Sequence, residues 1–198
     1  MAGMFHEGQR ELQDRFDTRR LADRIDSLLV KDTIGPGERA FIEARDMFFL
    51  ATCDPEGRPT CSYKGGDPGF VKVVDERTVA FPNYDGNGMY LSMGNIVGGS
   101  DVGMLFIDFE TGGRLRLDGR ATVDPDDRLA SEWPGAQFAV RVTPRAVYPN
   151  CPRYIHRYTL VERSPFVPRG EAPPPVPDWK RSQWACDVLP EGDPAREA

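Results

Sequence analysis

Three stretches between residues 58 and 119 combine strand-like alternation or a glycine-rich bend with basic and hydrogen-bonding side chains. Alternate residues of an extended strand share a face, so the first stretch predicts one polar face made of Arg58, Thr60, Ser62 and Lys64. A guanidinium, two hydroxyls and an ammonium on one face can bind a phosphate through charge-assisted hydrogen bonds. A solvated strand face ending in the glycine turn Gly65-Gly66 is the alternative.

The second stretch, Asn83-Tyr84-Asp85-Gly86-Asn87-Gly88, is typical of a loop between a strand and a short helix. Backbone amides at the start of such a helix can point at an anion, although an ordinary turn gives the same pattern. In the third stretch, Arg114 and Arg116 share a strand face, while Leu115 and Leu117 point into the core. Two such arginines indicate either a salt-bridged surface or a contact with the polar edge of a planar ring.

The bulk composition limits the classes of partner. The 198 residues carry a formal net charge of −6, with 39% hydrophobic and 28% charged residues. This balance argues against a general nucleic-acid or anionic-membrane binder, which needs a broad basic field. We find no apolar run of about 18 residues and no signal-peptide core, so we expect a cytoplasmic protein that does not bind membranes.

Four cysteines and two histidines leave little for a metal site. The cysteines, at positions 53, 61, 151 and 186, form no CxxC pair, so we expect no structural zinc. Cys53 and Cys61 flank a predicted type I turn, Asp54-Pro55-Glu56-Gly57, which would place Cys53 opposite Arg58 rather than Cys61. We therefore expect free, buried thiols.

The hydrophobic periodicity changes along the chain. It predicts an amphipathic helix over residues 7–30 and a short helix after Gly35-Pro36-Gly37. We expect these two helices to form an N-terminal segment, residues 1–44, that packs on the predicted barrel. From Met47 onward the pattern predicts short strands joined by tight turns, with short helices near residues 89–97 and after Asp124-Pro125. The predicted strands are 48–52, one from about residue 58, 70–75, 78–82, 102–109, 114–123, 137–142 and 158–162. This is the pattern of a mainly β (α+β) antiparallel barrel with peripheral helices over 45–164. A proline-rich extension, 165–198, follows.

An ordered set of motifs between residues 45 and 125 resembles the pyridoxamine 5′-phosphate oxidase-related flavoproteins, which share the FMN-binding split β-barrel. The matching residues are Phe49-Leu50-Ala51-Thr52, Gly57-Arg58-Pro59, Ser62-Tyr63-Lys64-Gly65, Pro68-Gly69-Phe70, Phe81-Pro82-Asn83-Tyr84-Asp85-Gly86-Asn87, Gly94-Asn95-Ile96, Val102-Gly103-Met104-Leu105-Phe106 and Leu115-Arg116-Leu117-Asp118-Gly119. The flanking Phe5-His6-Glu7-Gly8 and Asn150-Cys151-Pro152-Arg153-Tyr154-Ile155 resemble one branch of that superfamily.

The resemblance implies FMN bound at a homodimer interface, with both subunits contributing to each site. The strand at residues 58–64 would then contact the flavin and its phosphate, the loop at 84–87 would hold the ribityl phosphate, and Arg114 would lie near the ring. The cofactor-binding residues that we expect are Arg58, Thr60, Cys61, Ser62, Lys64, Tyr84, Asp85, Gly86, Asn87, Asn95 and Arg114. The proposed partners are a second copy of the chain and a small-molecule substrate or electron donor.

We therefore expect an FMN-dependent oxidoreductase in which the cofactor carries the chemistry and no single acid or base is obligatory. The C-terminal motifs of the true oxidases have no counterpart with the same spacing here, since Arg153-Tyr154-Ile155-His156-Arg157 is spaced differently. Oxidation of pyridoxamine phosphate itself is therefore not the expected reaction. His156 is read as a structural histidine in preference to a proton donor beside the flavin. The alternatives are a flavin-binding sensor, store or electron carrier, and a split barrel that holds a deazaflavin or haem.

Overall fold

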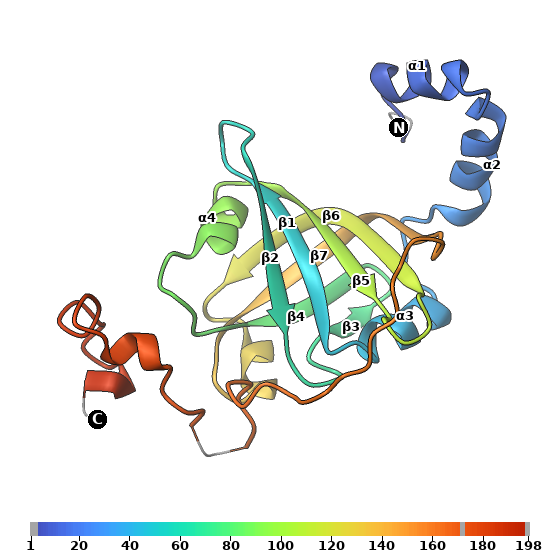
Figure 1. Cartoon of the computed structure of the whole chain (residues 1–198). Coiled ribbons are helices and arrows are strands. Elements are labelled where there is room, and N and C mark those ends of the chain that lie inside the picture. Colours follow the sequence, from blue (N-terminus) through green and yellow to red (C-terminus); the bar gives the residue numbers. More distant parts are fainter. Residues whose placement is uncertain (1–3, 171–172, 197–198) are drawn as a thin grey trace. The chain divides into compact units, whose positions relative to one another are not determined.

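A computed structural model describes residues 4–170 and 173–196 of the chain (Figure 1). It divides into two compact units, Met1–Thr159 and Leu160–Ala198. The first unit contains a seven-stranded sheet and four α-helices. None of the helices in the described ranges is long and apolar enough to cross a membrane.

All neighbouring strands of the sheet are antiparallel, in the order β2-β1-β5-β6-β7-β4-β3. The strands are β1 (Met47–Cys53), β2 (Pro59–Gly65), β3 (Lys72–Asp75), β4 (Thr78–Tyr84), β5 (Asp101–Ile107), β6 (Arg114–Asp124) and β7 (Ala136–Asn150). The predicted α+β class with an antiparallel sheet is confirmed. No ladder among the described strands joins β2 to β3, so hydrogen bonds do not close the sheet into a barrel.

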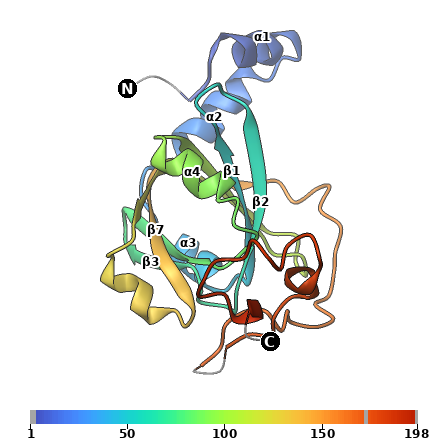
Figure 2. The same cartoon turned by 90° about the vertical axis from the view of Figure 1, so that its left-hand side faces the viewer.

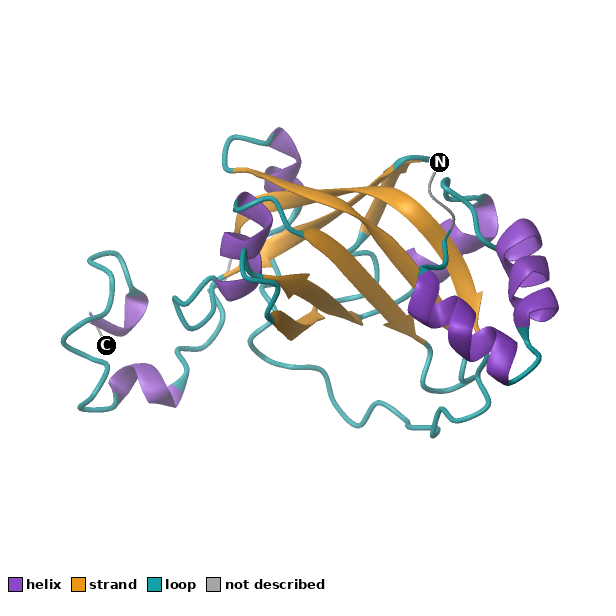
Figure 3. Cartoon of the chain, turned by 90° about the horizontal axis from the view of Figure 1, so that it is seen from above, coloured by secondary structure: helices purple, strands orange, loops and turns teal. Residues whose placement is uncertain are grey.

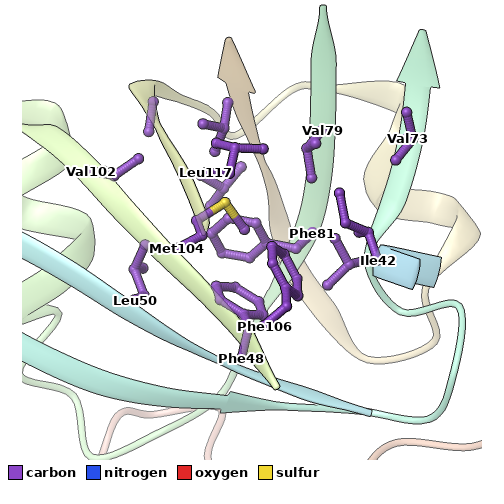
Figure 4. Packing of buried hydrophobic residues seen from close by; sticks show 14 of the residues in the cluster. Ile42, Phe48, Leu50, Val73, Val79, Phe81, Val102, Met104, Phe106 and Leu117 are labelled. Atoms are coloured by element: carbon purple, nitrogen blue, oxygen red, sulfur yellow. The ribbon is translucent and has the colours of Figure 1, made fainter. Parts of the chain in front are cut away.

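The sheet nevertheless curls around one apolar core, to which six of the seven strands contribute buried side chains (Figures 3 and 4). The ring of Phe48 on β1 meets that of Phe81 on β4 edge-on, with centroids 5.0 Å apart, although three strands separate β1 from β4 in the sheet order. Phe48 also contacts Phe106 and Phe70. These fully or almost fully buried rings draw the two ends of the sheet together without a hydrogen-bonded seam.

Two short helices pack on the curled sheet. The predicted helix after Gly35 is α3 (Pro36–Glu43), which starts with proline at its first position and buries Ile42 completely, with Phe41 packed on the core. Helix α4 (Leu91–Val97) connects β4 to β5, lies against β1 and buries Ser92, Met93 and Ile96 (Figure 2). The 3₁₀-helix η1 (Arg128–Glu132) fills the predicted place after Asp124-Pro125.

The single N-terminal helix predicted over residues 7–30 is wrong. The chain forms α1 (Glu7–Arg15) and α2 (Arg19–Leu29), separated by Asp17 in the left-handed conformation at φ 52°. The Thr18 amide donates to the Gln13 carbonyl at 2.8 Å and the Asp17 amide to that of Asp14 at 3.2 Å. These two bonds form a Schellman motif, which ends a helix, and aspartate tolerates the left-handed position better than most residues.

Residues 158–162 do not form the predicted strand. Strand β7 instead continues past Pro144 and Pro149 to Asn150, which pairs with Arg114 at the start of β6. The prediction ended this strand at residue 142, whereas β7 includes both prolines, although proline cannot donate to a ladder.

The second unit is the segment Leu160–Ala198. It contains two 3₁₀-helices, η2 (Asp178–Arg181) and η3 (Pro194–Arg196). Lys180 and Asp193 form a buried ion pair at 2.6 Å, and the rings of Trp179 and Trp184 stack with centroids 5.8 Å apart. The Lys180–Asp193 ion pair links the two 3₁₀-helices within a segment that has few buried apolar side chains.

All four cysteines are free, as predicted, but they are exposed rather than buried. Cys53 and Cys61 lie on the outer face of β1 and β2, because the strand alternation that buries Thr52 turns its neighbour Cys53 outward. The prediction of buried thiols is therefore wrong.

Strands β6 and β7 approach closely at Gly119, beside the bulge between Asp118 and Gly119. A Cβ at this position would lie 2.3 Å from the Thr143 carbonyl oxygen, whereas one at Gly94 in α4 would meet no atom within 4 Å. We expect Gly119→Ala to lower the free energy of unfolding by about 2 kcal/mol or more, because the backbone must move. Gly94→Ala, the control, should raise it by roughly 0.5–1 kcal/mol. Chemical denaturation measures both, and an equal effect of the two variants would contradict the tight approach.

Candidate functional site

A pocket of about 320 Å³ lies where β2, the end of β4 and α4 meet. The segment that connects β4 to α4 forms much of its wall. The lining residues are Ser62, Tyr63, Lys64, Asn83, Tyr84, Gly86, Asn87, Gly88, Met89, Tyr90, Leu91, Ser92 and Met93. Hydroxyl, amide and ammonium groups alternate with thioether and aromatic groups, a composition suited to a ligand with a polar group and an apolar body.

The alternation of β2 divides its side chains between two environments. Thr60, Ser62 and Lys64 are half-buried, whereas Cys61 and Tyr63 on the opposite face are exposed. The Ser62 hydroxyl lies 2.8 Å from that of Ser92, a buried residue of α4. The predicted polar face of this strand is therefore directed toward α4 from Thr60 onward.

A second hydrogen-bonded chain runs beside the pocket. The Thr60 hydroxyl lies 2.8 Å from that of the buried Thr52, which also accepts a hydrogen bond from Asn95 Nδ2 at 3.0 Å. Asn95 therefore ties α4 to the β1–β2 hairpin. This network fixes the wall of the pocket rather than lining it.

Lys64 is the basic side chain among the residues that line the pocket. Burial lowers the pKa of its ammonium, because the charged form loses hydration. In the part of the chain that the structure describes, no carboxylate forms an ion pair with this ammonium to offset the loss. A half-buried cation without a counter-charge is suited to an anionic ligand.

The loop from Tyr84 to Tyr90 forms the outer rim of the pocket. Burial raises the pKa of the Tyr84 phenol, and the negative charge of Asp67 raises it further, so this hydroxyl stays neutral at physiological pH. Asn87 Oδ1 accepts from the Met89 amide at 3.1 Å, and Gly88 has φ 75°. Tyr90 donates its hydroxyl to Gln137 Oε1 at 3.0 Å.

The structure brings together Ser62, Lys64, Tyr84, Gly86 and Asn87 in the pocket, with Thr60 and Asn95 in its supporting network. The predicted residue Asp85 lies in the same loop and is exposed.

Three predicted residues lie elsewhere. Arg58 lies in the β1–β2 turn, where it pairs with Asp54 and Glu56 and its side chain is 74% exposed. Cys61 occupies the outer face of β2. Arg114, the first residue of β6, donates to the Cys151 carbonyl.

Sequence reasoning missed several lining residues, namely Tyr63, Asn83, Gly88, Met89, Tyr90, Leu91, Ser92 and Met93. Most follow directly on the predicted loop, so extending that stretch to the start of the next helix would have found them. Gln137 carried no such signal, because its contact with the loop depends on the pairing of β4 with a strand more than 50 residues away.

Burial of an unpaired ammonium predicts a pH-dependent stability. Because the pKa of Lys64 is lowered on folding, the unfolded chain binds this proton more tightly, and stability rises with pH toward the ordinary value of 10.5. We expect ligand-free Lys64→Met to unfold at a higher temperature than the wild type at pH 7. The difference between the two unfolding temperatures should narrow as the pH rises. Thermal melts from pH 7 to 10, with the exposed Lys31→Met as control, measure this gap. A gap that widens with pH would contradict the assignment.

The family model described as pyridoxamine 5′-phosphate oxidase matches residues 36–164. A putative pyridoxamine 5′-phosphate oxidase from Lactobacillus delbrueckii is 23% identical, over 60% of this chain and 95% of that chain, with a TM-score of 0.47. The comparison with curated proteins gave no match.

Two other solved structures are similar at a lower level. HutZ, a haem storage protein from Vibrio cholerae, is 19% identical over 57% of this chain and 90% of its own, with a TM-score of 0.41. An F420 reductase is 19% identical over 60% of this chain and 97% of its own, with a TM-score of 0.39. Since the family model matches well over half of the chain, the protein belongs to the pyridoxamine 5′-phosphate oxidase family.

Proposed function

We propose that this protein is an FMN-dependent oxidoreductase that acts as a homodimer, and that its curled sheet is a split β-barrel of the FMN-binding type. The observation that carries the proposal is the half-buried Lys64, which lines a pocket of about 320 Å³ together with Ser62 and Ser92, whose hydroxyls lie 2.8 Å apart. Membership of the pyridoxamine 5′-phosphate oxidase family supports FMN as the ligand.

The residues of the pocket fit a flavin phosphate. In the proposed complex Lys64 binds the phosphate through a charge-assisted hydrogen bond, and the Ser62 and Ser92 hydroxyls supply neutral donors. Tyr84 and Asn87 hold the ribityl chain from the loop side. The half-buried Lys64 loses less hydration on binding than a fully exposed lysine, because folding has already removed part of its water.

One chain supplies too little positive charge for the whole ligand. A phosphate monoester carries a charge of about −1.5 to −2 at pH 7, whereas Lys64 supplies a single positive charge among the lining residues. This imbalance supports a site that a second subunit completes.

The outer face of the sheet supports the same dimer. Phe49 pairs with Tyr63 on one side and Leu105 on the other, and Ala51 pairs in the same way with Cys61 and Gly103. Tyr63 is 63% exposed and Ala51 is also exposed. An exposed apolar patch on the outer face of a sheet is a natural surface for a second copy of the chain.

When bound, FMN would supply hydride or electron transfer, and the chain's own residues would bind and orient it. Arg114 and His156, which were considered beside the ring, belong to no part of this pocket. The substrate or electron donor is proposed only as a small molecule that reaches the ring.

Cofactor binding tests the proposal directly. We expect the protein to retain FMN through gel filtration and to show the two visible absorption bands of oxidised flavin. Lys64→Met should weaken FMN binding by about tenfold to a hundredfold, because one charge-assisted contact is worth roughly 1.5–3 kcal/mol.

Arg58→Ala tests the sequence-based assignment of Arg58 to the cofactor site. Its place in the turn predicts a change below about twofold, the range of substitutions without a direct contact.

A colourless protein that retains no added FMN would refute the cofactor, and deazaflavin and haem would be titrated next. Bleaching of the bands by NADH or NADPH, with recovery when a substrate or oxygen is added, supports turnover. Bands that no donor bleaches would favour the alternative of a flavin-binding carrier or sensor.

Sedimentation tests the dimer. We expect two copies in solution, and Ala51→Arg should give a monomer, because it places a charge at the centre of the outer patch without entering the core. Val74→Arg, at another exposed strand position, is the matched control and should leave the dimer intact. A monomeric wild type, or a dimer that tolerates Ala51→Arg, would contradict this interface.

A further inference from the structure

An irregularity in strand pairing directs one side chain toward the pocket loop. Asn83 pairs with Phe138, but the next residue, Tyr84, pairs with Ala136, so Gln137 is an extra residue in β7 without a partner in the ladder. A bulge of this kind bends the strand and changes the direction of its side chain, and bulges are enriched beside functional sites.

The amide oxygen of Gln137 holds both ends of the loop. It accepts a hydrogen bond from Asn83 Nδ2 at 2.9 Å, where β4 leads into the loop, and another from the Tyr90 hydroxyl at 3.0 Å, where the loop enters α4. Asn83 is buried, and its Nδ2 also lies 3.3 Å from the Tyr84 carbonyl oxygen. The two ends of a seven-residue connection therefore meet at a single atom.

Tyr90 adopts a backbone conformation that a tyrosine rarely takes. Its φ is 49° and its ψ 28°, in the left-handed region, where a bulky residue is strained. Such a conformation persists only where other contacts hold it. The Tyr90 carbonyl accepts from the Gly94 amide in α4 at 2.6 Å, and the Gln137 contact holds the side chain.

We propose that Gln137 is a positioning residue and Tyr90 the latch that it holds, so that together they keep the 84–90 loop closed on the pocket and set how long a bound ligand stays. The middle of the loop, from Asp85 to Met89, is exposed, and no Cβ built at Gly86 or Gly88 would meet a neighbour. The loop can therefore open around its two fixed ends. The identity of the ligand rests on the proposed function, whereas the latch itself does not.

The latch is tested first without any ligand. Hydrogen exchange of the full chain should be about fivefold faster for the amides of residues 85–94 in Tyr90→Phe and in Gln137→Ala, the factor expected for one neutral hydrogen bond. Gln137→Glu, which keeps an acceptor oxygen at the same place, should restore most of the protection. Tyr158→Phe removes a hydroxyl from an exposed ring outside the pocket and is the matched control.

A double-mutant cycle separates the latch from general loosening of the fold. The two substitutions should not add, because either one removes the same contact. Unchanged exchange in Tyr90→Phe, or full additivity of the two effects, would overturn the proposal. Faster exchange throughout the sheet would also overturn it, because a latch confines the effect to the loop.

Ligand kinetics then test the consequence. With FMN as the probe, stopped-flow fluorescence of Tyr90→Phe should show dissociation about five times faster and association changed by less than about twofold, since most effects of contact loss fall on dissociation. Association slowed about fivefold, with an unchanged dissociation rate, would overturn the latch. If wild-type protein binds no FMN, the proposed function fails, while the ligand-free exchange experiment still decides whether the latch exists.

Discussion

The burial of one lysine ammonium on the inner face of β2 is the constraint on which the rest of this site depends. The two-residue period of the strand sends Thr60, Ser62 and Lys64 toward α4 and leaves Cys61 and Tyr63 outside. Partial burial lowers the pKa of Lys64. The fold tolerates this cost because Lys64 lines an open pocket beside Ser62 and Ser92 and is not part of the apolar core.

The sequence was sufficient to predict the period of β2, because strand parity is a local property. It also located the loop after β4 and the short helix that follows, from glycines and asparagines at a strand end. It failed at the end of α1, where Asp17 takes a place that glycine usually fills, and at β7, which continues past the predicted end at residue 142. The first failure is local, because a Schellman motif without glycine carries little signal in the residue types. The second depends on tertiary pairing with β6, which a local pattern does not contain.

The residues of the site also divide into those that a local pattern predicts and those that only the folded structure brings together. Arg58 continues the parity of β2 by one step, but the turn begins there, and Asp54 and Glu56 pair with its guanidinium. A carboxylate two or four residues away is visible in the sequence, yet its capture of the arginine depends on the turn conformation. Gln137 shows the converse case, because only the bulge in β7 brings it to Asn83 and Tyr90.

Curling of the sheet connects these local features. The Phe48–Phe81 contact draws β1 toward β4, and this brings the inner face of β2, the neighbour of β1, near the loop that leaves β4. A flat sheet in the same strand order would hold β2 far from β4, with four strands between them. The pocket therefore exists because the aromatic core bends the sheet, so its shape should be sensitive to core substitutions that touch no lining residue. The same packing that stabilises the fold thus sets the distance between the lysine and the loop that faces it.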